Sequence, residues 1–151
     1  MKKTALFPGS FDPFTKGHED IVLRSLNLFD DIVIGIGHNS QKTRYIDLQL
    51  MKGLIEQTFA AYPQVRVELY EGLTAKFAQK INAKFLIRGL RNTTDFEYEN
   101  TIAQANQHVW KEIETVFLIT SPHLAYISSS VVRDIHKGGG DVSSFLPYLI
   151  S

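Results

Sequence analysis

Residues 4–18 read TALFPGSFDPFTKGH, and this stretch decides the fold class. Thr4–Phe7 is a short apolar run, which is typical of a strand buried on both faces of a sheet. A loop with two prolines, a glycine and a hydroxyl follows it, and this loop leads to Gly17-His18 at the expected start of a helix. Free backbone N–H groups and the helix dipole favour an anion there. The dipeptide alone is more typical of an ordinary helix start, so the longer string carries the prediction of an anion-binding loop.

The rest of the chain repeats this alternation of apolar runs and amphipathic segments. Further strands are predicted at Ile32–Ile36, Val65–Leu69, Phe85–Ile87 and Val116–Ile119. The apolar residues from Ile21 to Phe29 repeat at helical spacing in the helix that begins at Gly17-His18, and those from Leu50 to Phe59 do so in a second helix with Asp47 as its N-cap. Further helices are predicted at Leu73–Asn82, Thr94–Trp110 and Ser129–Lys137, the last ending at three glycines. The first, second and fifth apolar runs are nearly uninterrupted, so we expect these strands to be buried on both faces. Five β–α units predict an α/β fold: one Rossmann-like, doubly wound domain over residues 1–151, with helices on both faces of a five-stranded parallel sheet.

Ligands of such sheets bind outside the carboxyl ends of the strands, so the segments that follow each strand are the candidate site. After the second, fourth and fifth strands come His38–Arg44, Arg88–Arg91, and Ser121-Pro122 with Ile127–Val131. Guanidinium groups at a strand end suit forked recognition of phosphate. Each segment also has a simpler interpretation. The first could be a solvated loop, the arginines of the second could pair with Asp95 or Glu97, and the serines of the third could only cap a helix. Their convergence on one sheet edge favours a phosphate-binding site.

Composition excludes several other classes of protein. The chain has 151 residues, 44% of them hydrophobic, with 16 Lys+Arg balanced by 16 Asp+Glu, so a general nucleic-acid or anionic-membrane binder is not expected. The absence of cysteine excludes disulfides and thiolate chemistry. The P-loop, the dinucleotide-binding glycine fingerprint and the hydrolase nucleophile elbow are missing. The five histidines show no paired metal spacing, so we expect no protein-held metal. Met1-Lys2-Lys3 begins like a signal peptide, but Pro8 and Gly9 interrupt any apolar core, and a soluble cytoplasmic protein is expected.

The string Gly9–Pro13 followed by Gly17-His18 resembles the signature of the adenylyl- and cytidylyltransferase superfamily. The usual form of that signature is His-x-Gly-His, and Thr15 stands at the position of its first histidine. This departure is typical of the phosphopantetheine adenylyltransferase branch. Further matches to that branch are Lys42, Ile87–Arg91, Asp95–Glu99 and Ile127–Ser130. The similarity runs over essentially the whole chain and in order.

The resemblance implies a reaction in which AMP passes from ATP to 4′-phosphopantetheine, giving dephospho-coenzyme A and pyrophosphate, with Mg²⁺ accompanying ATP. The ATP contacts that it implies are Ser10, Phe11, His18, Gly89, Leu90, Arg91, Glu99, Leu124, Ala125, Tyr126, Ile127, Ser128, Ser129 and Ser130. The implied phosphopantetheine contacts are Ser10, Lys42, Thr74 and Arg88, although position 74 is usually aliphatic. The resemblance also implies a homohexamer that coenzyme A inhibits by competing at the same site.

The chemistry is an in-line attack by one phosphate on another, and the attacking phosphate is already ionised near neutral pH. No general base is needed, so catalysis reduces to positioning and charge stabilisation. We assign catalytic roles to His18 at the α-phosphoryl oxygens, Lys42 with Arg88 at the acceptor phosphate, and Arg91 with Ser129-Ser130 at the β- and γ-phosphates. Glu99 is expected to fix the nucleoside side. These assignments require His18, Lys42, Arg88 and Arg91 to meet in one pocket.

Apolar residues on two of the predicted helices are candidates for a channel that holds the pantetheine arm, although ordinary core packing explains them equally well. They are Leu73, Ala75, Ile102 and Ala105, and the polar Asn106 lies beside them in the same helix as the last two. Trp110 is interpreted as core packing. The alternatives for the whole chain are another nucleotidyltransferase, such as a nicotinamide mononucleotide adenylyltransferase, and a non-catalytic nucleotide-sensing module. The module is disfavoured because binding alone does not need transition-state donors.

Overall fold

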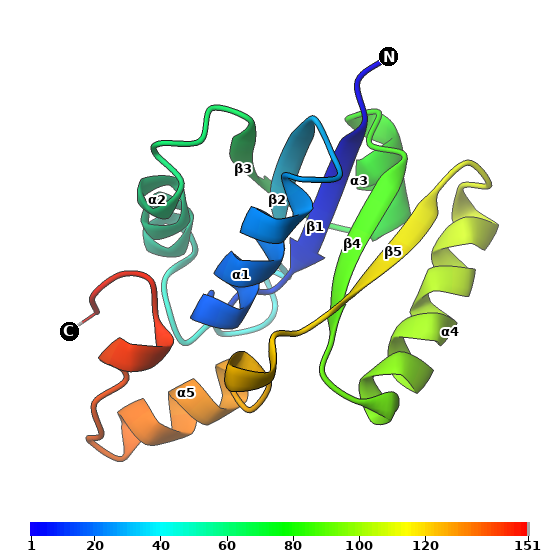
Figure 1. Ribbon diagram of the computed structural model, residues 1–151. Helices are drawn as coiled ribbons and strands as arrows, with labels where there is room; N and C mark the ends of the chain where they lie inside the picture. The colour runs from blue at the N-terminus through cyan, green and yellow to red at the C-terminus, as the bar shows by residue number, and fades with distance from the viewer. Residues whose placement is uncertain (151) are drawn as a thin grey trace.

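The computed structural model describes residues 1–150, which alternate strictly between strands and helices (Figure 1). The strands are β1 (Thr4–Gly9), β2 (Asp31–Gly37), β3 (Val65–Tyr70), β4 (Phe85–Leu90) and β5 (Glu114–Ile119). The helices are α1 (Lys16–Ser25), α2 (Leu48–Thr58), α3 (Thr74–Lys80), α4 (Thr93–Val109) and α5 (Ser129–Lys137), with short 3₁₀ turns η1 (Pro122–Leu124) and η2 (Ser143–Phe145). The predicted α/β fold is therefore confirmed, with five strands and five helices. None of the helices in the described part of the chain is long and apolar enough to cross a membrane.

All strand pairs are parallel and the order across the sheet is β3-β2-β1-β4-β5. The chain moves outward from β1 to β3, returns to the other side of β1, and continues through β4 to β5. The strand order therefore reverses between β1 and β4, which is where open parallel sheets bind their ligands. The ladder between these two strands has only two residue pairs, Ala5–Phe85 and Leu6–Leu86, whereas β1 and β2 pair from Thr4–Asp31 to Gly9–Ile36. The two central strands thus part before their carboxyl ends.

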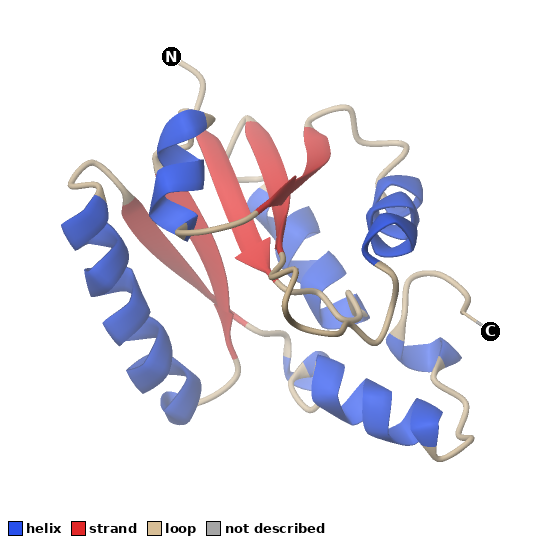
Figure 2. Ribbon diagram, turned by 180° about the vertical axis from the view of Figure 1, so that it is seen from behind, coloured by secondary structure: helices blue, strands red, loops and turns tan. Residues whose placement is uncertain are grey.

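Two hydrophobic clusters lie on opposite faces of the sheet (Figures 1 and 2). On β1, Ala5 and Phe7 join the cluster beneath α1, α2 and α5, while Leu6 joins the cluster beneath α3. This alternation follows from the two-residue period of a strand. Trp110, interpreted from the sequence as core packing, belongs to the second cluster. Helices thus cover both faces and leave the carboxyl edge of the sheet open.

Two expectations about the strands are wrong. β5 is an edge strand rather than one buried on both faces, because only β4 pairs with it, and its last residue, Ile119, is 69% exposed. β4 does not end at Ile87 but continues to Leu90, because its ladder with β5 extends to the pair Leu90–Ile119. Arg88 and Gly89 therefore lie on the strand, where the backbone ladder fixes their direction, and Arg91 is the first residue after it.

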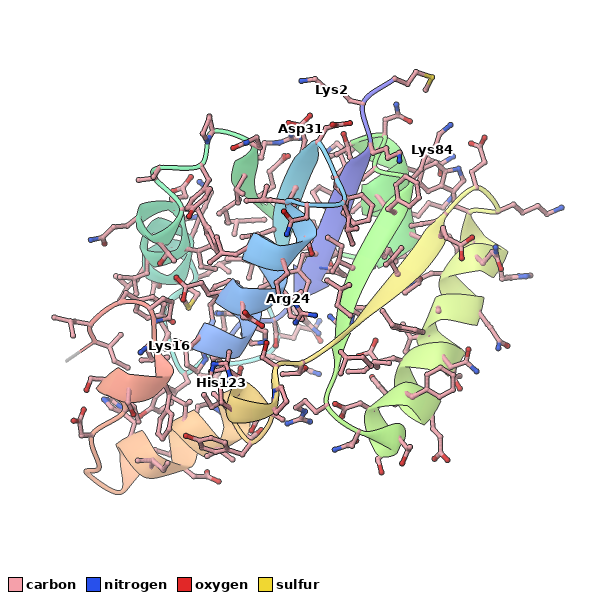
Figure 3. All side chains as sticks on the ribbon, in the orientation of Figure 1. Lys2, Lys16, Arg24, Asp31, Lys84 and His123 are labelled. Atoms are coloured by element: carbon pink, nitrogen blue, oxygen red, sulfur yellow. The ribbon has the colours of Figure 1, made fainter. Side chains whose placement is uncertain are left out.

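Four of the five helices begin with a side-chain cap at the carboxyl edge; α3 has none, and Asn92 caps α4. Thr15 caps α1, Asp47 caps α2 as predicted, and Ser128 caps α5, each accepting a bond from a backbone N–H in the first turn. Figure 3 shows Lys16 and His123 near this edge, whereas Lys2, Asp31 and Lys84 lie at the opposite, amino-terminal edge of the sheet. The caps define where these helices start and hence which N–H groups face the site.

Candidate active site

The loop between β1 and α1 is shaped by the ring of Phe11. Phe11 has a φ of 44°, in the left-handed region that bulky residues rarely adopt, and its ring is buried between Phe7 and Phe14, with centroids 5.2 Å from each. A Cβ at Gly9 would lie 2.8 Å from Cζ of this ring, so only glycine fits there. The packed rings therefore hold the loop close against the end of β1.

His18 is the third residue of α1 and completes a reciprocal cap at its start. The backbone N–H of Thr15 donates to Nδ1 of His18 at 2.9 Å, and the Thr15 hydroxyl accepts from the His18 backbone N–H. Since Nδ1 accepts a hydrogen bond, the neutral ring carries its proton on Nε2. Burial, together with the positive charges of Arg88 and Arg91, lowers the pKa of His18 from 6.5 to about 3. His18 is therefore a neutral hydrogen-bond donor throughout the physiological pH range.

Arg88 bridges the gap where β1 and β4 part. Its Nε and Nη2 donate to both carboxylate oxygens of Glu99 on α4, at 2.8 and 2.6 Å, and Nη1 donates to the carbonyl oxygen of Pro8. Glu99 is 8% exposed and is the one charged residue among the buried residues of the described chain. The pair joins α4 to the switch point and holds the guanidinium plane in one orientation.

Arg91 lies where α4 begins and is paired in the same way with Asp95. Its Nε and Nη2 donate to the Asp95 carboxylate at 2.9 and 3.1 Å, which leaves Nη1 without a protein acceptor among the described residues. This hydrogen bonding raises the pKa of Arg91 and lowers that of Asp95. The simpler interpretation, in which the arginines pair with nearby carboxylates, thus holds with Asp95 as predicted and with Glu99 in place of Glu97.

Three adjoining cavities open around Ser10, which lines all of them. The first cavity, of about 260 Å³, lies between the start of α1 and the end of β4 and contains His18, Arg88 and Arg91. The second, of about 230 Å³, lies between β4, α3 and α4 and shares Arg88 and Glu99 with the first. The third, of about 660 Å³, lies under the loop after β2 and contains Lys42. Two ligands can therefore meet at Ser10 and Arg88.

Comparison with known proteins identifies the family to which this arrangement belongs. Residues 6–135 match the family described as Cytidylyltransferase-like. The chain is 65% identical over 150 residues to the phosphopantetheine adenylyltransferase of Cytophaga hutchinsonii, which covers 99% of this chain and 100% of that protein. It is 50% identical over 147 residues to the protein of the same name from Flavobacterium psychrophilum, covering 97% and 96% of the two chains. The chain belongs to the phosphopantetheine adenylyltransferase family.

Solved structures with low sequence identity share the fold. A bifunctional NMN adenylyltransferase/ADP ribose pyrophosphatase from Francisella tularensis superposes with a TM-score of 0.74 at 14% identity, over 98% of this chain and 46% of that one. The same enzyme complexed with AMP and a manganese ion gives a TM-score of 0.72, also at 14% identity, over 99% and 46%. This chain thus spans about half the length of that protein. The likeness shows the fold alone, and the identification as a phosphopantetheine adenylyltransferase family member comes from the relatives with higher sequence identity.

The family resemblance implies a set of ATP and phosphopantetheine contacts, and most of these residues line the first two cavities of this phosphopantetheine adenylyltransferase family member. The first cavity contains Ser10, Phe11, His18, Arg88, Gly89, Arg91, Glu99, Leu124, Ile127, Ser128 and Ser129. Leu90, Ala125, Tyr126 and Ser130 do not line it. Leu90 is buried, Tyr126 is exposed against Phe145, and the Ser130 hydroxyl accepts from Arg133. Lys42 lies in the third cavity, so the four expected groups share a junction rather than one pocket.

Only some of the residues expected to form a channel for the pantetheine arm line a cavity. Ile102, Asn106 and the implied contact Thr74 line the second cavity, while Leu73, Ala75 and Ala105 do not. Ala75 is buried in the core, whereas Leu73 and Ala105 are exposed. The Thr74 hydroxyl is within 2.9 Å of the hydroxyl of Tyr70.

Sequence reasoning missed several residues that shape the cavities of this family member. Tyr70 and Tyr98 line the second cavity, and Asp12, Arg44 and Arg133 line the third. No motif in the sequence marks Tyr70 or Arg133. Asp12, Tyr98 and Arg44 lie within Gly9–Pro13, Asp95–Glu99 and His38–Arg44, but no role was predicted for them. Their positions depend on which loops the sheet topology brings together.

The pKa of His18 predicts a pH dependence of folding stability. The unfolded chain takes up a proton on this ring below pH 6.5, but the folded protein does so only near pH 3. The neutral ring therefore contributes stability above pH 6.5, and this contribution declines as the pH falls from about 6.5 toward 3. His18→Gln keeps an acceptor for the Thr15 N–H and removes the titration. Urea unfolding between pH 7 and pH 4.5 should show a smaller loss of unfolding free energy for His18→Gln than for wild type; parallel curves would contradict the lowered pKa.

Proposed function

We propose that this protein is an adenylyltransferase that moves AMP from ATP to 4′-phosphopantetheine, giving dephospho-coenzyme A and pyrophosphate. The observation that carries the proposal is the junction at Ser10 and Arg88, where a cavity with a neutral histidine donor meets a second, partly apolar cavity. The first cavity suits a triphosphate because helix N–H groups and two guanidiniums line it. The second suits the extended arm of the acceptor.

In the proposed reaction an oxygen of the acceptor phosphate forms a bond to the α-phosphorus of ATP. The bond from that phosphorus to the oxygen bridging to the β-phosphate breaks, and pyrophosphate leaves. Nε2–H of His18 donates to the α-phosphoryl oxygens, where negative charge must be stabilised. Because the donor is neutral, it needs no proton uptake before turnover. Arg91 directs its free Nη1 toward the β- and γ-phosphates, together with the backbone N–H of Ser129 at the start of α5. Ser130, which was expected to act with Ser129, does not line this cavity and takes no part in the proposal.

Glu99 takes a different role in this proposal from the one expected from the resemblance. Both of its carboxylate oxygens accept bonds from Arg88, so it is not free to hold the nucleoside. We assign it instead to holding Arg88 across the mouth of the second cavity. Arg88 with Ser10 then holds the acceptor phosphate from one side, and Lys42 approaches from the third cavity.

The proposal includes Mg²⁺ as part of the MgATP substrate. Among residues 1–150, no group of three or more His, Asp or Glu side chains is placed to hold a metal ion. The two carboxylates of the first cavity, Asp95 and Glu99, are each engaged by an arginine. The metal is therefore assigned to the triphosphate and water.

The remaining parts of the proposal concern assembly and regulation. Self-association is supported by exposed apolar side chains on α4 and at the end of β5, including Phe96, Tyr98 and Ile119, and the number of six subunits rests on the family resemblance alone. Competition by coenzyme A is supported by its pantetheine arm, which has the same chemistry as the acceptor. A cytoplasmic location stays a prediction.

The test of the proposed reaction is incubation with MgATP and 4′-phosphopantetheine, with dephospho-coenzyme A followed by mass and pyrophosphate by a coupled assay. Nicotinamide mononucleotide, and CTP in place of ATP, serve as the competing substrates. The proposal expects equal amounts of the two products and no comparable turnover with the competing substrates. Turnover with nicotinamide mononucleotide would favour the alternative transferase, and tight adenine-nucleotide binding without turnover would favour the sensing module.

Lys42→Ala is expected to weaken use of the acceptor more than binding of ATP. Lys42 lies in the third cavity, away from the triphosphate groups, and among the described residues its ammonium group has no carboxylate within 4.0 Å. Loss of a charge-assisted hydrogen bond is worth about 1.5–3 kcal/mol, or roughly tenfold to a hundredfold in affinity. Calorimetric titration with each ligand checks this. Equal weakening for ATP and phosphopantetheine would contradict the division of roles.

A further inference from the structure

The loop between β1 and α1 is held by side chains from distant parts of the chain. Each backbone carbonyl from Ser10 to Phe14 accepts a hydrogen bond from such a side chain: Arg44 donates to the first two, and Arg133, Ser129 and Tyr148 each donate to one of the other three. The donors come from the loop after β2, from α5 and from the C-terminal segment. Loss of one of these four donor residues therefore leaves most of the hydrogen bonds to the loop in place.

Arg44 differs from the other donors because it joins two loops of the site. Its Nη1 and Nη2 donate to the carbonyls of Ser10 and Phe11 at 2.7 and 3.0 Å, and its Nε donates to the carbonyl of Ile46 at 3.0 Å. The side chain is only 16% exposed, and its nearest carboxylate, Asp12, is 3.7 Å away. A planar guanidinium can reach three acceptors in this way, whereas the ammonium of a lysine is a single point on a flexible stem.

The loop that carries Lys42 depends on this contact. Asp12 accepts bonds from the backbone N–H groups of Tyr45 and Ile46 at one end of the loop, and His38 bonds to the Tyr70 carbonyl at the other. Between His38 and Tyr45, the remaining hydrogen bonds of the described structure are internal to the loop, apart from those of Arg44. Arg44 thus anchors the segment around Lys42 to the backbone of Ser10, where the three cavities meet.

We propose that Arg44 is a positioning residue for adenylyl transfer, acting through Lys42. It fixes the Lys42 ammonium group relative to Ser10 and His18, so that the acceptor phosphate is held in line with the α-phosphorus. The inference rests on the proposed function and adds a residue whose guanidinium group donates to backbone carbonyls of the site. A misplacement of about 1 Å in a reacting group can lower a rate on the order of 100-fold, so an anchor of this kind has a measurable kinetic effect.

Arg44→Lys tests the proposal, because it keeps the positive charge and removes the three-way contact. We expect kcat with MgATP and 4′-phosphopantetheine to fall by roughly 10- to 100-fold, while KM for ATP changes by less than about threefold. Arg66→Lys is the matched control, since Arg66 is an exposed β3 residue paired with Glu68, and its activity should equal wild type. An inactive wild type would remove the proposed function; an active wild type with an equally active Arg44→Lys would overturn this inference alone.

A double-mutant cycle distinguishes positioning of Lys42 from a general structural role. If Arg44 acts through Lys42, then adding Arg44→Lys to Lys42→Ala should change kcat by less than about threefold. A merely structural role would lower kcat in both backgrounds by the same factor, and that result would overturn the proposal. In Arg44→Gln the amide nitrogen occupies the position of Nε and can reach only the Ile46 carbonyl of the same loop, so its kcat should fall at least as far as that of Arg44→Lys. Thermal unfolding is measured for every variant, and a melting temperature below the assay temperature for both Arg44 variants would also count against positioning.

Discussion

His18→Ala is expected to fold normally and to lose roughly 10²–10³-fold in kcat, the scale for removing one preorganised donor from a site of this kind. The reason lies in the hydrogen bond from the Thr15 N–H to Nδ1, which assigns the remaining proton to Nε2, and in a pKa of about 3, which keeps the ring neutral. Steady-state kinetics with both substrates, beside thermal unfolding, measure the effect. The KM for ATP should change little, because the donor acts on charge that develops in the transition state.

His18→Gln is the control that separates catalysis from helix capping. A glutamine at this position of a capping box can accept the Thr15 N–H, so α1 should begin where it does in the wild type. Its kcat is expected to be as low as that of His18→Ala, because its amide is anchored at the cap rather than aimed at the phosphate. A variant with near wild-type turnover would remove His18 from the mechanism. A steep fall of wild-type kcat with an apparent pKa near 6.5, abolished in His18→Gln, would contradict the neutral donor.

Arg88→Met is expected to produce the largest loss of stability among single changes at the site, together with loss of turnover. It leaves the Glu99 carboxylate, only 8% exposed, without its partner, and it frees the carbonyl of Pro8 where β1 and β4 part. Breaking a buried ion pair destabilises by about 3–5 kcal/mol. The Arg88 side chain is 31% exposed, so about 2–3 kcal/mol is expected here, below the value for a fully buried pair. Urea unfolding measures it.

The asymmetry of this pair supplies the control for that experiment. Glu99→Met leaves Arg88 near solvent, so it should cost only about 1 kcal/mol, the scale of a lost hydrogen bond. The double variant Arg88→Met with Glu99→Met should regain at least half of the stability that Arg88→Met loses, because no buried charge is left unpaired. Equal losses in the two single variants, or a double variant no more stable than Arg88→Met, would show that desolvation of Glu99 is not the cause. Activity should be absent wherever Arg88 is missing.

The local elements of the fold could be predicted closely from the sequence. Helix α5 has the predicted bounds, Ser129–Lys137, because a serine cap precedes it and a glycine run follows it. Asp47 caps α2 as expected. Errors arose where an element depends on a neighbour in space. The end of β4 depends on its ladder with β5, and β5 is half-exposed because it lies at the sheet edge.

For the candidate site, too, residue types could be predicted from the sequence, whereas contacts between distant segments could not. The loop from Gly9 to His18 and the arginines at 88 and 91 were marked by residue type, since phosphate chemistry needs cations and N–H donors near glycine. Of the two carboxylates that pair with those arginines, Asp95 was predicted and Glu99 was not. Asp95 lies one helical turn into the segment after Arg91, whereas Glu99 reaches Arg88 across the gap between α4 and β4. Lys42 was expected in the same pocket as His18, but the loop after β2 carries it into the neighbouring cavity.

The sequence by itself determined the parallel α/β architecture and most helix starts, which depend on short-range properties of the chain, namely apolar periodicity, capping residues and glycine positions. Its motif strings also indicated the family, by resemblance, and the residues from which a phosphate site is proposed. Only the tertiary structure decided that β1 and β4 part at the switch point, that Glu99 holds Arg88, and that Arg44 ties two loops together across 34 and 33 positions of sequence. Such contacts join residues far apart along the chain, and they form only after the sheet order has brought their loops to one edge.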